Sequence, residues 1–308
     1  MARLSFSDPP TASELEQLAE RVPALRAPLT ASQLRGGFTN HNYRIADADG
    51  RVWVLRVTEP AEMLGADRDA EYSATVTAAG LGIGPVVLAY LRPERVFVLG
   101  FIDGRPVPEE EMRGEDMIRR VAATLLRLHD GPPMESSFSV FGIVAMYRDN
   151  AQTLGVRLPD EFDWSWARAE EMRAALASGK RPARPCHNDL LIGNFLDEGH
   201  TLRILDWEYA GMGDPYFDLA NFSTNHELDE SGDRMLLEAY FGEYREQDFA
   251  RLRLMRIMSD FREAMWGVVQ QGLRTTDTDY EAYAGQYFDR LRRRATDPQY
   301  RRWIEQLT

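Results

Sequence analysis

The sequence predicts an α+β fold with two lobes: a small β-rich N-terminal lobe with one main helix, and a larger, mostly helical C-terminal lobe. Short runs of β-forming residues gather before residue 102, and the pattern becomes mainly helical after residue 103. The chain has 308 residues, which is enough for two lobes. We therefore expect an N-terminal lobe of residues 1–102 and a C-terminal lobe of residues 103–308, joined near residues 100–104.

The N-terminal lobe is expected to begin with a helix over residues 11–22, in which Ser13 and Glu16 have the spacing of a capping box. A second helix is expected over residues 66–85, because Gly80 and a Gly/Pro exit close it. Strands are expected over residues 29–35, 41–47, 51–57, 86–91 and 95–102.

The C-terminal lobe is expected to contain amphipathic helices over residues 109–130 and 163–179. Short β character returns around Cys186 and over residues 201–211, and three to five helices are expected from Pro215 onward. Ligands favour the cleft between two lobes, so we expect the functional site there.

Composition excludes several classes of protein. The formal net charge of −13 argues against a nucleic-acid partner and mildly favours small cationic partners. No apolar run approaches the roughly 20 residues of a membrane-spanning helix, and the N-terminus lacks a signal-peptide core, so we expect a cytoplasmic protein without a membrane partner. Cys186 is the only cysteine, which excludes an internal disulfide and favours a buried, inert thiol.

The segment CHNDLLIGNFL, residues 186–196, places polar side chains among apolar neighbours. Asp189 and Asn194 have the D-x-x-x-x-N spacing of the catalytic loop in kinase-type phosphotransferases, and Asp206 follows behind the apolar run LRIL. In that chemistry the first Asp orients or accepts the proton of a hydroxyl, while the Asn and the second Asp bind Mg²⁺. The alternative is a set of turn residues with a strand-end cap, but the joint pattern is much rarer than either fragment.

With the longer segment from HNDLLIGNFL to LRILDWEYAGMGDPYFDLANF, residues 187–222, the chain resembles the aminoglycoside phosphotransferase/choline kinase superfamily and, within it, the bacterial choline/ethanolamine kinases. The resemblance implies a bilobal protein-kinase-like fold that uses ATP and Mg²⁺ to phosphorylate the hydroxyl of a small cationic amino-alcohol. Asp189 is then the catalytic residue, and Asn194 and Asp206 are the metal ligands. Glu208 is a further candidate, because it follows Asp206 by two residues on the same expected strand face.

The resemblance extends to a nucleotide loop. The segment GGFTNHNY, residues 36–43, is similar to the loop with which choline kinases cover the phosphates. Gly37, Thr39, Asn40 and Asn42 are the residues that match, and small side chains and backbone N–H groups there can approach phosphate oxygens.

An arginine takes the place of the lysine that kinases usually carry on the third strand. Lys180 is the only lysine, so a cation in the N-terminal lobe must be an arginine, and Arg56 in WVLRV has the matching position. Glu71, on the following helix, is the expected ion-pair partner that orients Arg56. The alternatives are a surface arginine and a solvent-facing glutamate. Backbone groups of Phe101 and Ile102 are expected to bind the adenine edge.

Two further residues are expected to support the loop. His187 is expected to brace the catalytic loop through its ring nitrogens rather than to act as a base. Asp218 in YFDLAN resembles the family acid that accepts backbone N–H bonds from the catalytic loop.

The C-terminal helices are expected to hold the acceptor alcohol. Choline kinases bind the ammonium group with aromatic rings and a carboxylate. Trp266 and Tyr280 match the aromatic positions, although ordinary core packing explains them equally well, and Glu263 and Glu227 are the candidate acids. Glu263 stands where the family often has another Trp, and Asn225 where it often has an acid. The thinner, more acidic box suits ethanolamine at least as well as choline.

Two other functions stay open at this point. One is an antibiotic kinase of the aminoglycoside type, or another metabolite kinase of the same superfamily. The other is a pseudokinase that binds nucleotide without catalysis, against which the intact set of Asp189, Asn194 and Asp206 argues. The sequence predicts no oligomeric state.

Overall fold

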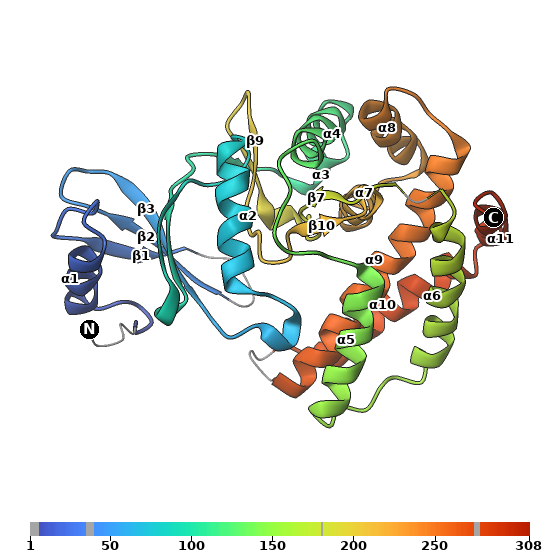
Figure 1. Cartoon of the computed structure of the whole chain (residues 1–308), viewed down its shortest axis with the longest axis horizontal. Coiled ribbons are helices and arrows are strands. Elements are labelled where there is room, and N and C mark those ends of the chain that lie inside the picture. The colour runs from blue at the N-terminus through green and yellow to red at the C-terminus, as the bar shows by residue number, and fades with distance from the viewer. Residues whose placement is uncertain (1–5, 35–39, 180, 274–277) are drawn as a thin grey trace.

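A computed structural model describes residues 6–34, 40–179, 181–273 and 278–308 of the chain. It confirms the predicted α+β class, because strands dominate the N-terminal part and helices the rest (Figure 1). The sheet lies at one side of the molecule and the helical lobe at the other. Among the helices of the described residues, none is long and apolar enough to cross a membrane.

The N-terminal sheet has five antiparallel strands in the order β1-β2-β3-β5-β4. Its neighbouring strands β3 and β5 place Leu55 opposite Val98 and Arg56 opposite Phe97. The strands are β1 Thr30–Gln33, β2 Asn40–Ala46, β3 Val52–Thr58, β4 Val87–Leu91 and β5 Val96–Gly100.

The two faces of β3 have different partners. Successive side chains of a strand point to opposite faces, so Leu55 and Arg56 face away from each other. Leu55 is buried in an apolar cluster with residues of α1 (Ala12–Arg21), which covers one face. Arg56 faces α2 (Arg68–Gly80), where its Nη2 lies 3.3 Å from Oε1 of Glu71. The alternation of the strand therefore delivers a cation to the face that meets the helix.

The capping box of α1 differs from the expected one. The helix begins at Ala12, and its N-cap is Thr11. The Glu14 backbone N–H donates to Oγ1 of Thr11 (3.3 Å), and the Thr11 backbone N–H donates to Oε2 of Glu14 (2.6 Å). The predicted pair of Ser13 and Glu16 is wrong, because Ser13 already has a helical conformation inside the first turn, whereas the extended residue that caps the helix is Thr11.

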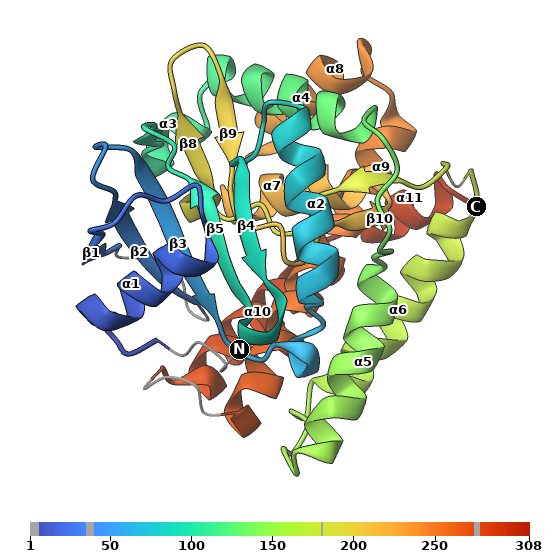
Figure 2. The same cartoon turned by 60° about the vertical axis from the view of Figure 1, so that its left-hand side comes forward.

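Helix α2 stands between the sheet and the helical lobe in both views (Figures 1 and 2). The ring of Tyr72 stacks on that of Tyr90 in β4, with 5.2 Å between the centroids. Ala74 and Ala78 are buried in the larger apolar core, which consists mainly of C-terminal residues. The helix that carries Glu71 is therefore packed against both the sheet and the helical lobe.

The C-terminal lobe is built around α9, a helix of 28 residues that is buried along most of its length. The single helix expected over residues 109–130 is wrong, because Gly114 has an extended conformation and separates α3 from α4. Helix α5 lies in a stretch for which the sequence analysis named no helix. The helices are α3 Glu109–Met112, α4 Glu115–His129, α5 Val140–Thr153, α6 Phe162–Ala177, α7 Pro215–Asn225, α8 Glu230–Phe241, α9 Glu246–Leu273, α10 Tyr280–Ala295 and α11 Tyr300–Glu305.

Two small sheets hold the polar segments of the chain in place. Strand β7 pairs with β10, and β8 pairs with β6 and β9. Residues 187–194 lead from β7 to β8, and residues 205–210 lead from β9 to β10, so the two loops start and end on the same small sheets. The strands are β6 Arg105–Pro106, β7 Arg184–Cys186, β8 Phe195–Asp197, β9 Leu202–Ile204 and β10 Gly211–Gly213.

The position of Cys186 gives a test of this core. Its side chain is fully buried, and burial raises the pKa of its thiol well above the usual value. We expect this thiol to be inert toward an aromatic disulfide reagent in the native protein and to react stoichiometrically in denaturant. Exposed Ser13 supplies the control, because Ser13→Cys in a Cys186→Ser background should react without denaturant. Rapid native reaction of Cys186 would contradict the packing of β7 against β10.

Candidate active site

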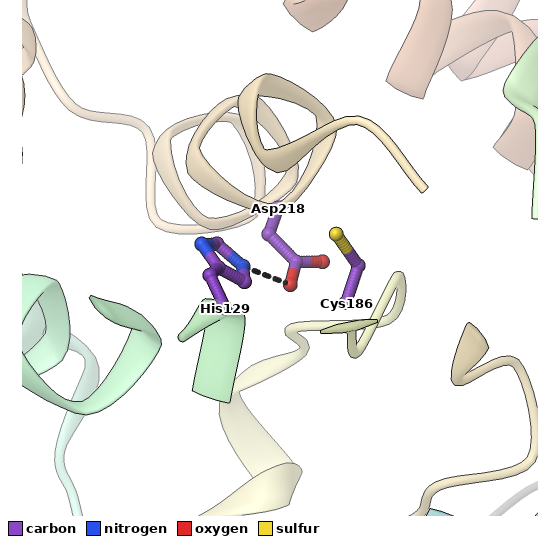
Figure 3. A group of neighbouring side chains, drawn as sticks. All are labelled: His129, Cys186 and Asp218. Atoms are coloured by element: carbon purple, nitrogen blue, oxygen red, sulfur yellow. Dashed lines mark hydrogen bonds and ion pairs between the residues drawn. The ribbon is translucent and has the colours of Figure 1, made fainter. Parts of the chain in front are cut away.

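A buried carboxylate anchors the segment that carries Asp189. Asp218, on α7, accepts the backbone N–H of His187 at Oδ2 (2.8 Å) and that of Asn188 at Oδ1 (2.6 Å). His129 of α4 lies against the same carboxylate, with Nε2 at 3.0 Å from Oδ2 (Figure 3). These contacts fix the start of the loop, which is what a scaffold role for Asp218 requires.

His129, Cys186 and Asp218 are the one group among the described residues whose potential ligand atoms lie close enough together to suggest a metal ion (Figure 3). Both oxygens of Asp218 already accept backbone N–H groups. Burial raises the pKa of the Cys186 thiol, whereas a metal would need the thiolate. The cluster is therefore better explained as a support beneath the loop than as a metal centre.

His187 ties the loop to the β8–β9 hairpin. Its Nε2 donates to the carbonyl oxygen of Leu205 (2.9 Å), and its Nδ1 accepts the backbone N–H of Asp189 (3.2 Å). Burial lowers the pKa of His187, which favours this neutral tautomer. Because both ring nitrogens are used inside the protein, the geometry favours a structural role for His187 over a catalytic one.

Asn194 lies where the loop and the hairpin meet. Its Nδ2 donates to the carbonyl oxygen of Asp189 (2.8 Å), and its own carbonyl oxygen accepts the backbone N–H of Leu205 (2.8 Å). Since the amide nitrogen is committed to the loop, Oδ1 is the side-chain atom left for a cation.

Asp189 is nearly buried, and Arg262 of α9 lies against it. Nη1 of Arg262 donates to Oδ1 of Asp189 at 3.0 Å. Burial raises the pKa of Asp189 to about 6, although the Arg262 guanidinium opposes this effect. Asp189 is therefore mainly ionised at neutral pH, as an acceptor of a hydroxyl proton must be. The sequence analysis missed Arg262, because its partner is 73 residues away along the chain.

Asp206 and Glu208 meet Arg56 across the junction of the lobes. Oδ1 of Asp206 accepts a hydrogen bond from Nη2 of Arg56 at 2.6 Å, and Oε2 of Glu208 lies 3.8 Å from the same nitrogen. Burial acts to raise the pKa of Asp206, but the charge and the hydrogen bond of Arg56, together with the charge of Arg68 and other nearby groups, lower it. Both acids lie beyond β9, so the strand alternation expected for them does not apply. A turn with Asp206 at φ 65° brings both toward Arg56 instead.

A second arginine, Arg68, completes this junction. Its Nη1 donates to Oε2 of Glu71 (2.7 Å) and to Oε2 of Glu208 (2.9 Å), and its Nη2 donates to the carbonyl oxygen of Glu59 (2.9 Å). Burial raises the pKa of Glu208 to about 7, and the charge of nearby Asp206 adds to this rise. The sequence analysis did not predict that Arg68 bridges Glu71 and Glu208.

Oxygen ligands for Mg²⁺ are available at this junction. Asn194 offers Oδ1, and the Asp206 side chain keeps an exposed fraction of 28%, with only Oδ1 hydrogen-bonded to a described residue. Such a set of amide and carboxylate oxygens suits a hard cation. Glu208 fits less well, because its Oε2 is already held by Arg68.

The residues expected to bind adenine, Phe101 and Ile102, come directly after strand β5. Strand β5 ends its pairing with β3 at Gly100, so the backbone of Phe101 and Ile102 continues beyond the last paired residue. This is the place where a base edge can be bound by backbone groups. Gly37 and Thr39 of the predicted nucleotide loop lie outside the described residues.

The other two loop candidates lie on β2. Asn42 is directly opposite Arg56, so both side chains lie on the face of the sheet that meets α2. Asn40, two residues earlier, has the same orientation, and its Oδ1 accepts a hydrogen bond from Nη2 of Arg68 (3.3 Å). The structure therefore brings Asn40, Asn42 and Arg56 to the same face as Asp206.

Three aromatic rings and a carboxylate gather between α9 and α10. The ring centroid of Trp266 lies 5.8 Å from that of Tyr280 and 5.6 Å from that of Tyr283. The Tyr283 hydroxyl donates to Oε1 of Glu263 at 2.5 Å. The structure thus brings together three of the four acceptor candidates and adds Tyr283, which the sequence analysis did not name. The helical i,i+3 spacing from Tyr280 is the signal that would have identified it.

Glu227 is not part of this group. It is exposed and lies just after the end of α7 in a left-handed conformation, with φ at 50°. Its Oε2 lies 3.4 Å from Nη2 of Arg113, in the link between α3 and α4. An acceptor role for Glu227 stays a prediction, and its contact with Arg113 argues against it.

One cavity of about 630 Å³ lies apart from all of these residues. It is formed by α5, α6 and the start of α7, and Phe138, Trp166 and Asp214 contribute to its lining. None of the candidate site residues lines it.

Comparison with known proteins places the chain among phosphotransferases. Residues 30–255 match the phosphotransferase enzyme family. The protein LicA of Haemophilus influenzae is 25% identical over 252 residues, which are 77% of this chain and 72% of the relative. The crystal structure of a choline/ethanolamine kinase family protein from Mesorhizobium loti superposes with a TM-score of 0.80 at 29% identity, covering 95% of this chain and 98% of that one. The choline kinase LicA from Streptococcus pneumoniae shares the fold, with a TM-score of 0.75 at 18% identity over 91% of this chain and 97% of that one.

The anchoring role of Asp218 can be measured directly. Asp218→Asn replaces one acceptor oxygen with an NH₂ group, which would point at a backbone N–H donor of His187 or Asn188. We expect the free energy of unfolding to fall by about 1–3 kcal/mol, the cost of an unmet buried hydrogen bond, as measured by denaturant unfolding. The amide hydrogens of His187 and Asn188 should also exchange faster. Asp116→Asn, at an exposed position of α4, is the matched control. Unchanged exchange at both amides would refute the anchor.

Proposed function

The chain belongs to the phosphotransferase enzyme family, and on this basis we propose that it transfers the γ-phosphoryl group of ATP to the hydroxyl of a small cationic amino-alcohol of the choline or ethanolamine type. One observation carries the proposal. The loop with Asp189 and Asn194 is hydrogen-bonded to the hairpin that precedes Asp206, and Asp206 contacts Arg56 of the N-terminal lobe. This arrangement supplies a base, two metal ligands and a phosphate-binding cation at one junction. Because the reaction consumes ATP, a cytoplasmic location is part of the proposal.

Each residue has a role that follows from its contacts. Asp189 accepts the hydrogen bond of the acceptor hydroxyl and takes its proton as the phosphoryl group transfers. Arg56, oriented by Glu71, binds phosphate oxygens with its planar donor groups. Asn194 and Asp206 would hold Mg²⁺, which neutralises phosphate charge when it is bound. Catalysis then depends on positioning and charge rather than on a covalent intermediate.

The acceptor is placed by its ammonium group. Trp266, Tyr280 and Tyr283 pack on one another, and their rings would attract a cation bound at this end of the site. Glu263 supplies a carboxylate beside them. A primary ammonium can donate hydrogen bonds to Glu263, whereas a quaternary ammonium can only be attracted by its charge. The pairing of rings with an acid therefore favours an amino-alcohol with N–H groups at least as strongly as choline.

A panel of acceptors tests the proposed function. ADP release with Mg-ATP should rise with ethanolamine or choline and stay at background with 3,3-dimethylbutan-1-ol, which has the shape of choline without its charge. Release only with aminoglycosides would assign the chain to the antibiotic-kinase alternative. Binding of Mg-ATP without transfer to any acceptor would support the pseudokinase alternative.

Asp189→Ala tests the catalytic assignment. We expect kcat to fall by about 10²–10⁴-fold, the usual contribution of a general base, while the Kd for Mg-ATP stays within about twofold. Steady-state kinetics and isothermal titration calorimetry measure the two quantities. A variant with the turnover of the unmodified enzyme would remove Asp189 from the mechanism.

A further inference from the structure

Arg262 occupies the centre of the acceptor end of the site. Its side chain is only 2% exposed, and Nη1 donates both to Oδ1 of Asp189 (3.0 Å) and to Oε2 of Glu263 (2.7 Å). The guanidinium lies over the ring of Tyr209, 4.4 Å from its centroid. Contacts with two carboxylates and one ring fix both the position and the plane of this group.

The same contacts connect the catalytic carboxylate to the aromatic group. Glu263 is shared, because its Oε2 accepts from Arg262 and its Oε1 accepts from the Tyr283 hydroxyl. Tyr283 packs against Trp266 in turn. A continuous chain of contacts therefore runs from the rings that would hold the ammonium to Oδ1 of Asp189, the oxygen next to the one left for the hydroxyl.

We propose that Arg262 is a positioning residue for phosphoryl transfer: it holds Asp189 by Oδ1, leaves Oδ2 for the acceptor hydroxyl, and through Glu263 fixes the distance between the hydroxyl and ammonium subsites. This inference rests on the proposed function and adds to it a residue that acts through Asp189. Among the described residues, Oδ1 of Asp189 is the carboxylate oxygen that carries a hydrogen bond, so Oδ2 stays available.

The net charge of Arg262, Asp189 and Glu263 is compatible with a cationic acceptor. Arg262 carries one positive charge, and Asp189 and Glu263 carry two negative charges when ionised. The guanidinium therefore does not turn the subsite positive, and the surplus negative charge remains for an ammonium group. Arg262 also supplies Asp189 with the partner that a nearly buried carboxylate needs in order to stay charged.

Kinetics of two substitutions test the proposal. We expect Arg262→Met to lower kcat by about 10²-fold, the usual effect of a displaced catalytic group, with the KM for ATP unchanged within about twofold. Arg262→Lys should recover about a tenth of the lost turnover or more, because lysine keeps the positive charge. Recovery should be incomplete, because lysine lacks the planar, forked set of donors of arginine. Unchanged kcat in Arg262→Met would overturn the proposal. A raised kcat would also overturn it, since Arg262 would then be blocking Asp189.

A second arginine on α9 supplies the matched control. Arg256 is also buried, but it pairs with Asp233 and with the carbonyl oxygen of Leu228, away from the site. Arg256→Met should lower the denaturation midpoint, as Arg262→Met does, and leave the kcat of the folded enzyme unchanged. Equal losses of kcat in both variants would reduce Arg262 to a structural residue.

Stability measurements test the contact between Arg262 and Asp189 independently of activity. Arg262→Met leaves Asp189 buried without its partner, and Asp189→Asn removes that charge. The double variant should therefore unfold at a higher denaturant concentration than the sum of the two single shifts predicts. Additive shifts would contradict the contact. If the unmodified enzyme released no ADP with any acceptor, the proposed function would fail. The double-mutant cycle of Arg262→Met and Asp189→Asn would still show whether Arg262 holds Asp189.

Discussion

The site depends on one fully buried carboxylate, that of Asp218. Asp218 would be costly in the core without donors, and it finds them in the backbone of His187 and Asn188 and in the ring of His129. These bonds hold Asn188 in the uncommon left-handed conformation, with φ at 67°. The turn that follows delivers Asp189 toward α9 with its orientation already set. A loop held only by apolar contacts would not fix the direction of a carboxylate in this way.

The junction of the lobes shows why buried charge is present at all. Arg56 and Arg68 of the N-terminal lobe face Glu71, Asp206 and Glu208, and the two contacts with the C-terminal acids span 150 and 140 residues of sequence. Such buried pairs contribute little net stability, because desolvation offsets their attraction. Stability therefore does not explain the cluster. A site that must exchange partners when phosphates and a divalent cation enter does explain it, since such a site needs charges of both signs close together.

Local patterns predicted the strands and the loop with Asp189, because each depends on spacing within a few residues. Trp266 and Tyr280 were named only from the resemblance to choline kinases. The sequence analysis missed Arg68 and Arg262, whose important partners lie 140 and 73 residues away. Distance along the chain hides such pairs from any reading of periodicity. For Glu227 the difficulty is different, because it is itself the left-handed residue after α7 and its exposed side chain lies near Arg113. The break at Gly114 is likewise a backbone event that an amphipathic pattern does not reveal.

The acceptor end of the proposed site contains a carboxylate, Glu263, as well as aromatic rings. Rings attract cations through their faces, and cages of rings serve to recognise quaternary ammonium groups. Glu263 is different, because a carboxylate accepts hydrogen bonds from N–H groups and leaves part of its capacity unused beside a methylated nitrogen. Its two oxygens are also already engaged by Arg262 and Tyr283, so it is held in one orientation. In the proposed function, a fixed acceptor of hydrogen bonds next to aromatic rings would select by the number of N–H groups as well as by charge, unlike a purely aromatic cage.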